Sequence, residues 1–194
     1  SGGVLVILRY AHELAKQGHE VTVFVENPSL FRRIVANILG IAPSWFPDLQ
    51  AAVTRVNCFA DAPLGTFDQI VATSVPTALH VDRRKDLTPS RCCFLVQHDE
   101  GLYHSSREDA DRSYRTSMKK VVVSNWIKEE VEKHHGGSIK VLLNTIDKQS
   151  CHEVRGLRDP KTTTVYMLAH SYDWKGSKEG CAILKKLNEN IIYW

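Results

Sequence analysis

The stretch that decides the fold is KVVVSNWIKEEVEKHHGGSIKVLL, residues 120–143. Residues 120–124 form a short apolar, β-branched run, residues 125–135 carry apolar side chains at helical spacing, and residues 139–143 form a second apolar run after two glycines. Near-continuous apolar strands that alternate with helices are typical of a parallel sheet covered by helices on both faces. This segment therefore predicts a strand, a helix and a second strand of an α/β domain.

The same alternation extends to both sides of this segment. It predicts a doubly wound, Rossmann-like parallel sheet for residues 1–147, a polar, irregular linker for residues 148–161, and the start of a second α/β domain for residues 162–194. We expect helices at 3–18, 30–39, 75–81, 106–118 and 176–187, and further strands at 20–25, 52–58, 69–73, 92–97, 162–169 and 190–194.

Length and composition limit the function. With 194 residues, 43% of them apolar and 24% charged, the chain has the composition of a globular protein of one to two domains. The net charge of +3 is too small to indicate nucleic-acid or membrane binding by electrostatics. No apolar run approaches the roughly 20 residues of a membrane-spanning helix. Five scattered cysteines without a C-x-x-C spacing are typical of reduced thiols, so we expect a cytoplasmic protein.

The two ends of the sequence carry a further expectation. The chain begins at Ser1 without a methionine or a leader, and it stops at Trp194 inside an expected strand. We therefore expect a fragment that lacks the first strand of its sheet and most of its second domain.

Polar side chains follow the expected strand at 92–97. Ligands of an open parallel sheet bind beyond the carboxyl ends of its strands, so His98 and Asp99 are candidates for catalysis, although a solvated loop would have the same sequence character. Ser124 and Asn125 follow the strand at 120–124 in the same way, and their simpler interpretation is a cap for the next helix.

Two further pairs of residues are candidates for binding an anion. Gly2 and Gly3 open the first expected helix, where glycines let backbone N–H groups approach a phosphate or simply form a tight turn. His170 and Lys175 lie between a strand end and a helix start, where they suit an anionic group unless they are ordinary surface residues. No Cys/His spacing predicts a metal site, no G-x-S-x-G a hydrolase, and no Walker loop an NTPase.

Taken together, these segments resemble family 4 glycosyltransferases, which have the two-domain GT-B fold. The resemblance extends over nearly the whole chain, and its motifs stand in the family's order. They are SGGV at 1–4, LAKQGHEVTV at 14–23, FDQIVATS at 67–74, FLVQHDE at 94–100, VSNWIK at 123–128, LNTID at 143–147 and HSYDWKG at 170–176.

The resemblance implies a sugar transfer with retention of configuration, without a metal, from a nucleotide-diphosphate sugar to a sugar, polysaccharide or lipid acceptor. It implies that His98 and Asp99 lie near the transferred sugar or the acceptor hydroxyl, where an oxocarbenium-like transition state develops. It also implies no nucleic-acid partner and a possible peripheral association with a membrane. The donor-binding residues that it implies are Gly2, Gly3, Ser124, Asn125, His170 and Lys175.

The sequence departs from the family at several positions. His170 stands where many members have arginine, Thr145 replaces a glycine, and Leu143 replaces a proline. The family's paired glutamates, E-x7-E, fall beyond Trp194, so we expect this polypeptide by itself to have little or no transferase activity.

Two other classes of protein remain open on the sequence. One is an NAD-dependent Rossmann oxidoreductase, in which Glu26 is a candidate for binding the ribose. The other is a non-catalytic ligand-binding module of the periplasmic-binding type, which also pairs two α/β halves.

Overall fold

The computed structural model describes residues 2–27, 29, 34, 38, 43, 45–102, 106–145, 165, 167 and 169–187. The chain divides into two compact units, Ser1–Thr145 and Ile146–Trp194, and each is described by itself below. The expected helix at 30–39, the linker at 148–161 and the expected strands at 162–169 and 190–194 lie wholly or largely outside the described residues.

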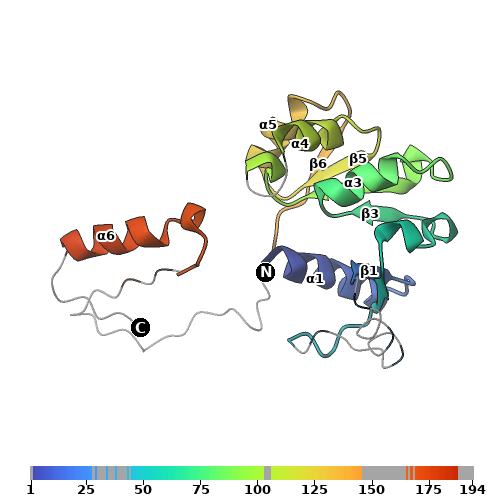
Figure 1. Ribbon diagram of the computed structural model, residues 1–194, viewed down its shortest axis with the longest axis horizontal. Coiled ribbons are helices and arrows are strands. Elements are labelled where there is room, and N and C mark those ends of the chain that lie inside the picture. Colours follow the sequence, from blue (N-terminus) through green and yellow to red (C-terminus); the bar gives the residue numbers. More distant parts are fainter. Residues whose placement is uncertain are drawn as a thin grey trace. The chain divides into compact units, whose positions relative to one another are not determined.

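The first unit begins with a helix and a small parallel sheet. Helix α1 (Gly2–Lys16) buries Leu8 and Ala11 and is followed by a turn at Gly18, whose φ of 92° lies in the left-handed region that glycine favours. Strands β1 (Thr22–Glu26) and β2 (Ala52–Val56) then pair in parallel, and α1 contacts β1 (Figure 1). The expected helix and both expected strands are confirmed.

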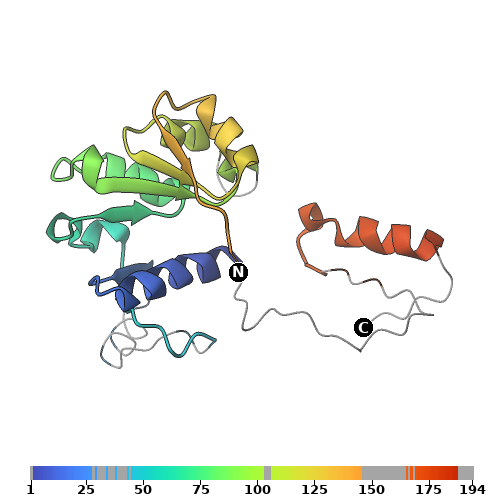
Figure 2. The same cartoon turned by 180° about the vertical axis from the view of Figure 1, so that it is seen from behind.

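A second, four-stranded sheet forms most of the unit. Its strands are β3 (Ile70–Ala72), β4 (Cys92–Val96), β5 (Lys119–Val122) and β6 (Ile139–Val141), all parallel and in sequential order (Figures 1 and 2). Helices α3 (Val75–Asp82), α4 (Arg107–Tyr114) and α5 (Asn125–Glu132) connect consecutive strands. Each strand-helix-strand connection has the crossover form that parallel pairing requires.

The core lies between this second sheet and its three helices. Alternate residues of β4, Cys92, Phe94 and Val96, belong to one buried cluster with residues of α3, α4 and α5. Since successive side chains of a strand point to opposite faces, all three helices cover the same face of the sheet. Tyr114 of α4 is fully buried between the helices and the sheet, where its ring stacks on Phe94 of β4.

The interior behind the sheet includes the charged residue Lys120. Lys120 of β5 is 1% exposed, and its ammonium group donates to the carbonyl oxygens of Thr116 (2.8 Å) and Met118 (2.7 Å) and to the Thr116 hydroxyl (3.0 Å). These bonds hold residues 115–118 in a turn, which explains why α4 ends at Tyr114 and not near residue 118 as the sequence predicted.

The α/β class with parallel strands is confirmed, and the arrangement is consistent with a Rossmann-like fold. The sequence predicted one continuous sheet, whereas the described strands form two. Among the described strands, neither β1 nor β2 pairs with a strand of the second sheet, so no backbone hydrogen bonds between these strands connect the two sheets. An edge-on contact between Phe24 of β1 and Phe67, with ring centroids 5.6 Å apart, joins the first sheet to the second.

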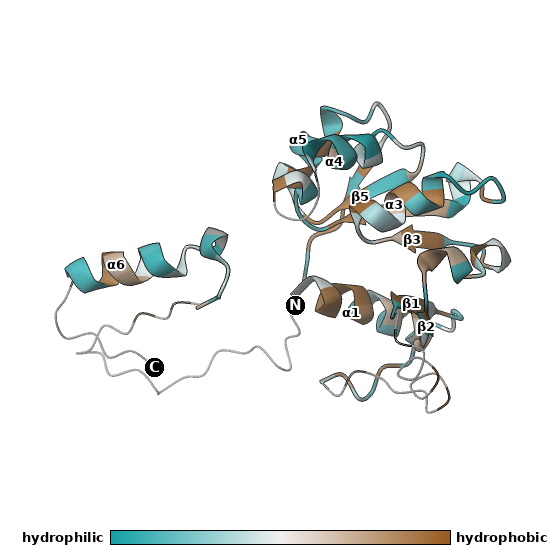
Figure 3. Cartoon of the chain, viewed as in Figure 1, coloured by the Kyte–Doolittle hydropathy of each residue, from teal (hydrophilic) through white to brown (hydrophobic). Residues whose placement is uncertain are grey.

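The second unit contains helix α6 (Ser177–Leu187), which follows a single 3₁₀ turn at Asp173–Lys175. A hydrophobic stretch, residues 181–184, lies in the middle of the helix between hydrophilic residues on both sides (Figure 3). In the described parts of both units, no helix is long and apolar enough to cross a membrane.

Candidate functional site

The carboxyl ends of the strands in the second sheet carry the candidate site, because ligands of parallel α/β sheets bind at that edge. Residues 97–100 follow β4, and Ser124 follows β5. The first turn of α1 reaches the same edge, since a Cβ atom placed on Gly3 would lie 3.5 Å from Nε2 of Gln97. The structure therefore places residue 3 close to the side chain of Gln97, which directly precedes the predicted site residues His98 and Asp99.

Gly2 and Gly3 are already part of α1 and form no separate glycine loop. A side chain at Gly2 would meet nothing within 4 Å, and one at Gly3 would make only ordinary contacts with Gln97. The first N–H groups of a helix have no partner within the helix, so they can bind an anion from this position. The surroundings of Gly2 and Gly3 therefore have room for a larger side chain and do not require glycine.

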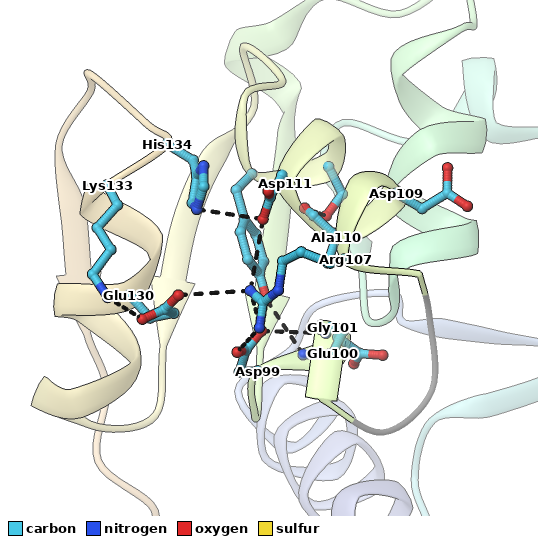
Figure 4. Close-up of polar contacts among 12 residues, drawn as sticks. Asp99, Glu100, Gly101, Arg107, Asp109, Ala110, Asp111, Glu130, Lys133 and His134 are labelled. Carbon is cyan, nitrogen blue, oxygen red and sulfur yellow. Dashed lines mark hydrogen bonds and ion pairs between the residues drawn. The ribbon is translucent and has the colours of Figure 1, made fainter.

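Asp99 is 3% exposed, and its carboxylate accepts hydrogen bonds from four donors (Figure 4). Arg107 donates through Nη1 to Oδ1 (3.1 Å) and through Nη2 to Oδ2 (2.5 Å), while the Tyr114 hydroxyl and the Gly101 N–H each donate to Oδ1 at 3.2 Å. Burial works to raise the pKa of Asp99, but the hydrogen bond and charge of Arg107 lower it on balance. A carboxylate held in this way is a structural anchor, and it is poorly suited to accept a proton.

Arg107 is the centre of the polar network drawn in Figure 4. Besides its bonds to Asp99, its Nη1 lies 3.6 Å from carboxylate oxygens of both Asp111 and Glu130. Glu130 also pairs with Lys133, and Asp111 lies 3.3 Å from Nε2 of His134. One guanidinium group therefore connects the turn after β4 to α4 and α5.

His98 and Glu100 form a second, separate pair at this edge. Nε2 of His98 lies 3.6 Å from Oε1 of Glu100, and the two side chains are 36% and 6% exposed. Burial, followed by the neighbouring charge of Asp99, raises the pKa of Glu100 to about 7. Glu100 can therefore gain or lose a proton in the neutral range, as a group involved in proton transfer must.

Sequence reasoning did not assign a role to Glu100, although it stands in the polar run after β4. A usable signal was present, because two adjacent acidic residues at a strand end cannot both ionise freely once they are buried. What the sequence could not show was which of the two is neutralised by an arginine.

Ser124 is the N-cap of α5, and its hydroxyl accepts a hydrogen bond from the N–H of Ile127 at 3.3 Å. The predicted capping role is confirmed. Asn125 is exposed in the first turn of the same helix. Both lie at the carboxyl edge of the second sheet, and their role in binding a donor stays a prediction.

His170 and Lys175 lie in the segment that leads into α6 of the second unit. The N–H of His170 donates to the Ser177 hydroxyl at 2.8 Å, and Nδ1 of His170 accepts from the N–H of Tyr172 at 3.1 Å. Gly176, with a φ of 70°, then turns the chain into the helix. This segment folds onto the start of α6, and its contact with a phosphate stays a prediction.

The described residues contain no group of three or more His, Cys, Asp or Glu side chains that could hold a metal ion. Their four cysteines, Cys58, Cys92, Cys93 and Cys181, are free thiols. Burial raises the pKa of both Cys92 and Cys93, which disfavours the reactive thiolate form of these two side chains.

Comparison with protein-family models, with curated proteins and with solved structures found no match for this chain.

Proposed function

We propose that this chain is the acceptor-side domain, with the beginning of the donor-side domain, of a retaining glycosyltransferase of the GT-B type. The observation that carries the proposal is the approach of α1 to the turn after β4: a Cβ atom placed on Gly3 would lie 3.5 Å from Nε2 of Gln97, and Gln97 precedes the His98–Glu100 pair in the chain. A helix N-terminus suits the diphosphate of a nucleotide sugar, and an ionisable pair beside it suits the sugar or the acceptor hydroxyl.

Sugar transfer from a nucleotide sugar requires groups that stabilise the leaving diphosphate. A nucleoside diphosphate leaves with growing negative charge, which N–H donors and a cationic side chain held in place can stabilise. In this proposal the first turn of α1 and His98 supply those groups, while Asp99 fixes the turn after β4, which carries His98. Asp99 thus supports the site and does not act as its base.

The second unit contributes donor-binding groups in the same proposal. His170 and Lys175 contact the diphosphate, and the acceptor is a sugar, a polysaccharide or a lipid. A cytoplasmic location and a peripheral contact with membranes belong to this proposal as well.

One observation bears on the oxidoreductase alternative. Glu26 ends β1, where an acidic residue of a dinucleotide-binding fold would bind the ribose. Its Oε1 instead accepts a hydrogen bond from the N–H of Phe59 at 3.3 Å. A carboxylate has two acceptor oxygens, so this bond leaves room for a ribose hydroxyl, and Glu26 keeps its place in the oxidoreductase alternative.

A binding experiment tests the proposal. The chain is titrated with UDP, GDP, dTDP and NAD by calorimetry, with inorganic pyrophosphate as the control for charge alone. We expect one nucleoside diphosphate to bind more tightly than pyrophosphate. Binding of NAD alone would favour the oxidoreductase, and binding of none of the nucleotides would overturn the proposal.

A pair of lysine variants tests the contribution of the second unit. Lys175→Ala should weaken binding of the nucleoside diphosphate by about tenfold, as expected for the loss of one charge-assisted contact. Lys185→Ala removes an equal charge from the last turn of α6 and is the matched control. Equal affinity of the two variants would show that Lys175 does not contact the phosphate.

A further inference from the structure

Two adjacent acidic residues at the candidate site have opposite surroundings. Asp99 is saturated by hydrogen bonds from Arg107, Tyr114 and Gly101. Glu100 is nearly as buried, and the ion-pair partner of its carboxylate is the imidazole of His98. Asp99 therefore keeps its charge, whereas Glu100, whose pKa is raised to about 7 by burial and by the charge of Asp99, can exchange a proton beside His98.

The backbone holds the His98–Glu100 pair in place. The N–H of Glu100 donates to the hydroxyl oxygen of Tyr114 at 3.3 Å, and that hydroxyl donates to Asp99 at 3.2 Å. Tyr114 is fully buried in the core, so both acidic residues are fixed to α4 through one ring. The backbone of the turn that carries Glu100 is thus fixed to α4, and the His98 side chain lies beside it with 36% of its surface exposed.

The two ends of the imidazole have different surroundings. Nε2, the nitrogen that faces Glu100, is shielded from solvent, although 36% of the His98 side chain is exposed. A proton on Nε2 is therefore stabilised by Glu100, while the positive charge that it gives the ring can act on a ligand at the exposed side.

Other charged groups around the pair do not supply this positive charge. From α4, Arg107 is engaged by Asp99 and also faces Asp111, and the Tyr114 hydroxyl donates to Asp99. From α5, Glu130 faces Arg107. His134, which follows α5, faces Asp111. The pKa of Glu100, raised to about 7, means that its carboxyl group can exchange a proton at neutral pH.

We propose that Glu100 is a positioning residue, which shares one proton with His98 and holds the imidazole as a cation when the diphosphate of the donor is bound; this role rests on the proposed function. In the empty site the proton can reside on the Glu100 carboxyl. When an anion binds, the O–H bond of Glu100 breaks and an N–H bond forms at Nε2 of His98. The proton is conserved, and no further reactant takes part.

Imidazole titration by NMR tests the pair without any ligand. His98→Gln assigns the His98 resonance, and Glu100→Gln removes the carboxylate while keeping the size of the side chain. We expect the titration midpoint of His98 to fall by about 1 pH unit in Glu100→Gln, because an anion at this distance favours the charged ring. Glu129→Gln, which changes an exposed residue of α5, should leave the midpoint unchanged. An unchanged midpoint in Glu100→Gln would overturn the proposal.

The reciprocal measurement guards against a variant that fails to fold. In His98→Gln, the carboxyl ¹³C resonance of Glu100 should titrate at higher pH than in the wild-type protein, because the cationic partner is gone. If that resonance titrates at the same pH in both proteins, the two groups do not share a proton.

Nucleotide binding then separates this proposal from the proposed function. The affinity for the nucleoside diphosphate should fall as the pH rises above 7, and in Glu100→Gln the fall should begin about 1 pH unit lower, with an affinity about tenfold weaker at pH 7. Failure of the wild-type chain to bind any nucleotide would remove the proposed function, and with it the ligand-binding role of the pair. Tight binding with the same pH profile in both proteins would leave the proposed function standing and refute the role of Glu100.

Discussion

Replacement of Glu100 by glutamine should change how the stability of the protein depends on pH. Glutamine resembles the protonated carboxyl group, and it cannot ionise. The pKa of Glu100 is raised from 4.5 to about 7 in the folded protein by burial and then by Asp99. A difference of this size corresponds to up to about 3 kcal/mol of folding free energy, at 1.36 kcal/mol for each pH unit.

The sign of the effect follows from the raised pKa. Below pH 4.5 the carboxyl is protonated in both the folded and the unfolded chain, so Glu100 contributes its full stability there. That contribution is lost as the pH rises through about 7, because a carboxylate must then stay buried in the folded protein. The free energy of unfolding of the wild-type chain should therefore fall, relative to Glu100→Gln, between pH 4.5 and pH 8.

Urea unfolding at pH 5 and at pH 8, followed by far-ultraviolet circular dichroism, measures this difference. Other groups titrate over the same range, and comparison of the two proteins cancels their contributions. Sharing of the proton with His98 reduces the difference, so we expect between about 1 and about 3 kcal/mol. Glu129→Gln should follow the wild-type protein at both pH values. The reasoning would be refuted if the change in the free energy of unfolding between pH 5 and pH 8 were the same in the wild-type chain and in Glu100→Gln to within about 0.5 kcal/mol. Effects of distant sites add to within about this amount, so a smaller difference is not significant.

Three further variants test other parts of the first unit by the same unfolding assay. Arg107→Ala should lower the free energy of unfolding by about 2 kcal/mol, which is less than the loss of a fully buried ion pair because 41% of the arginine side chain is exposed. Arg112→Ala removes an exposed ion pair on the same helix and is the control. A loss in Arg107→Ala no larger than in Arg112→Ala would contradict the anchoring of Asp99. Ser124→Ala should cost about 1 kcal/mol through loss of the α5 cap, and Ser124→Asp should restore most of it. Burial lowers the pKa of Lys120 from 10.5 to about 8, so the free energy of unfolding should rise by up to about 3 kcal/mol between pH 8 and pH 10.5. Lys120→Met should remove that rise. A rise that persists in Lys120→Met would rule out Lys120 as its cause.

The strands of the second sheet could be predicted from the sequence because each belongs to a short, mostly apolar run between expected helices. Cys92–Val96 is an example in which the order of residues alone places a buried strand. Helix ends were harder to predict, since the end of α4 depends on Lys120, a residue of the next strand whose ammonium group binds the carbonyl oxygens beyond Tyr114. The division into two sheets was missed because apolar periodicity predicts strands but not the partners with which they pair.

At the candidate site, the position of the polar run could be predicted and the roles within it could not. His98, Asp99 and Glu100 are consecutive, so the sequence treats them as one group of polar residues after a strand. Their separation into an anchored carboxylate and an ionisable pair depends on Arg107, which reaches Asp99 from α4. Such a contact is set by the packing of α4 against the sheet and leaves no pattern in the local sequence.

Tyr114 shows how the core and the site depend on each other. Its ring packs on Phe94 inside the core, while its hydroxyl accepts from the N–H of Glu100 and donates to Asp99. The same side chain therefore fills the space behind β4 and fixes the two acidic residues that follow that strand. A change that shifts α4 would alter both the packing of Phe94 and the electrostatics of Glu100. The protonation of Glu100 thus depends on the position of α4 as well as on the residues that a ligand would contact.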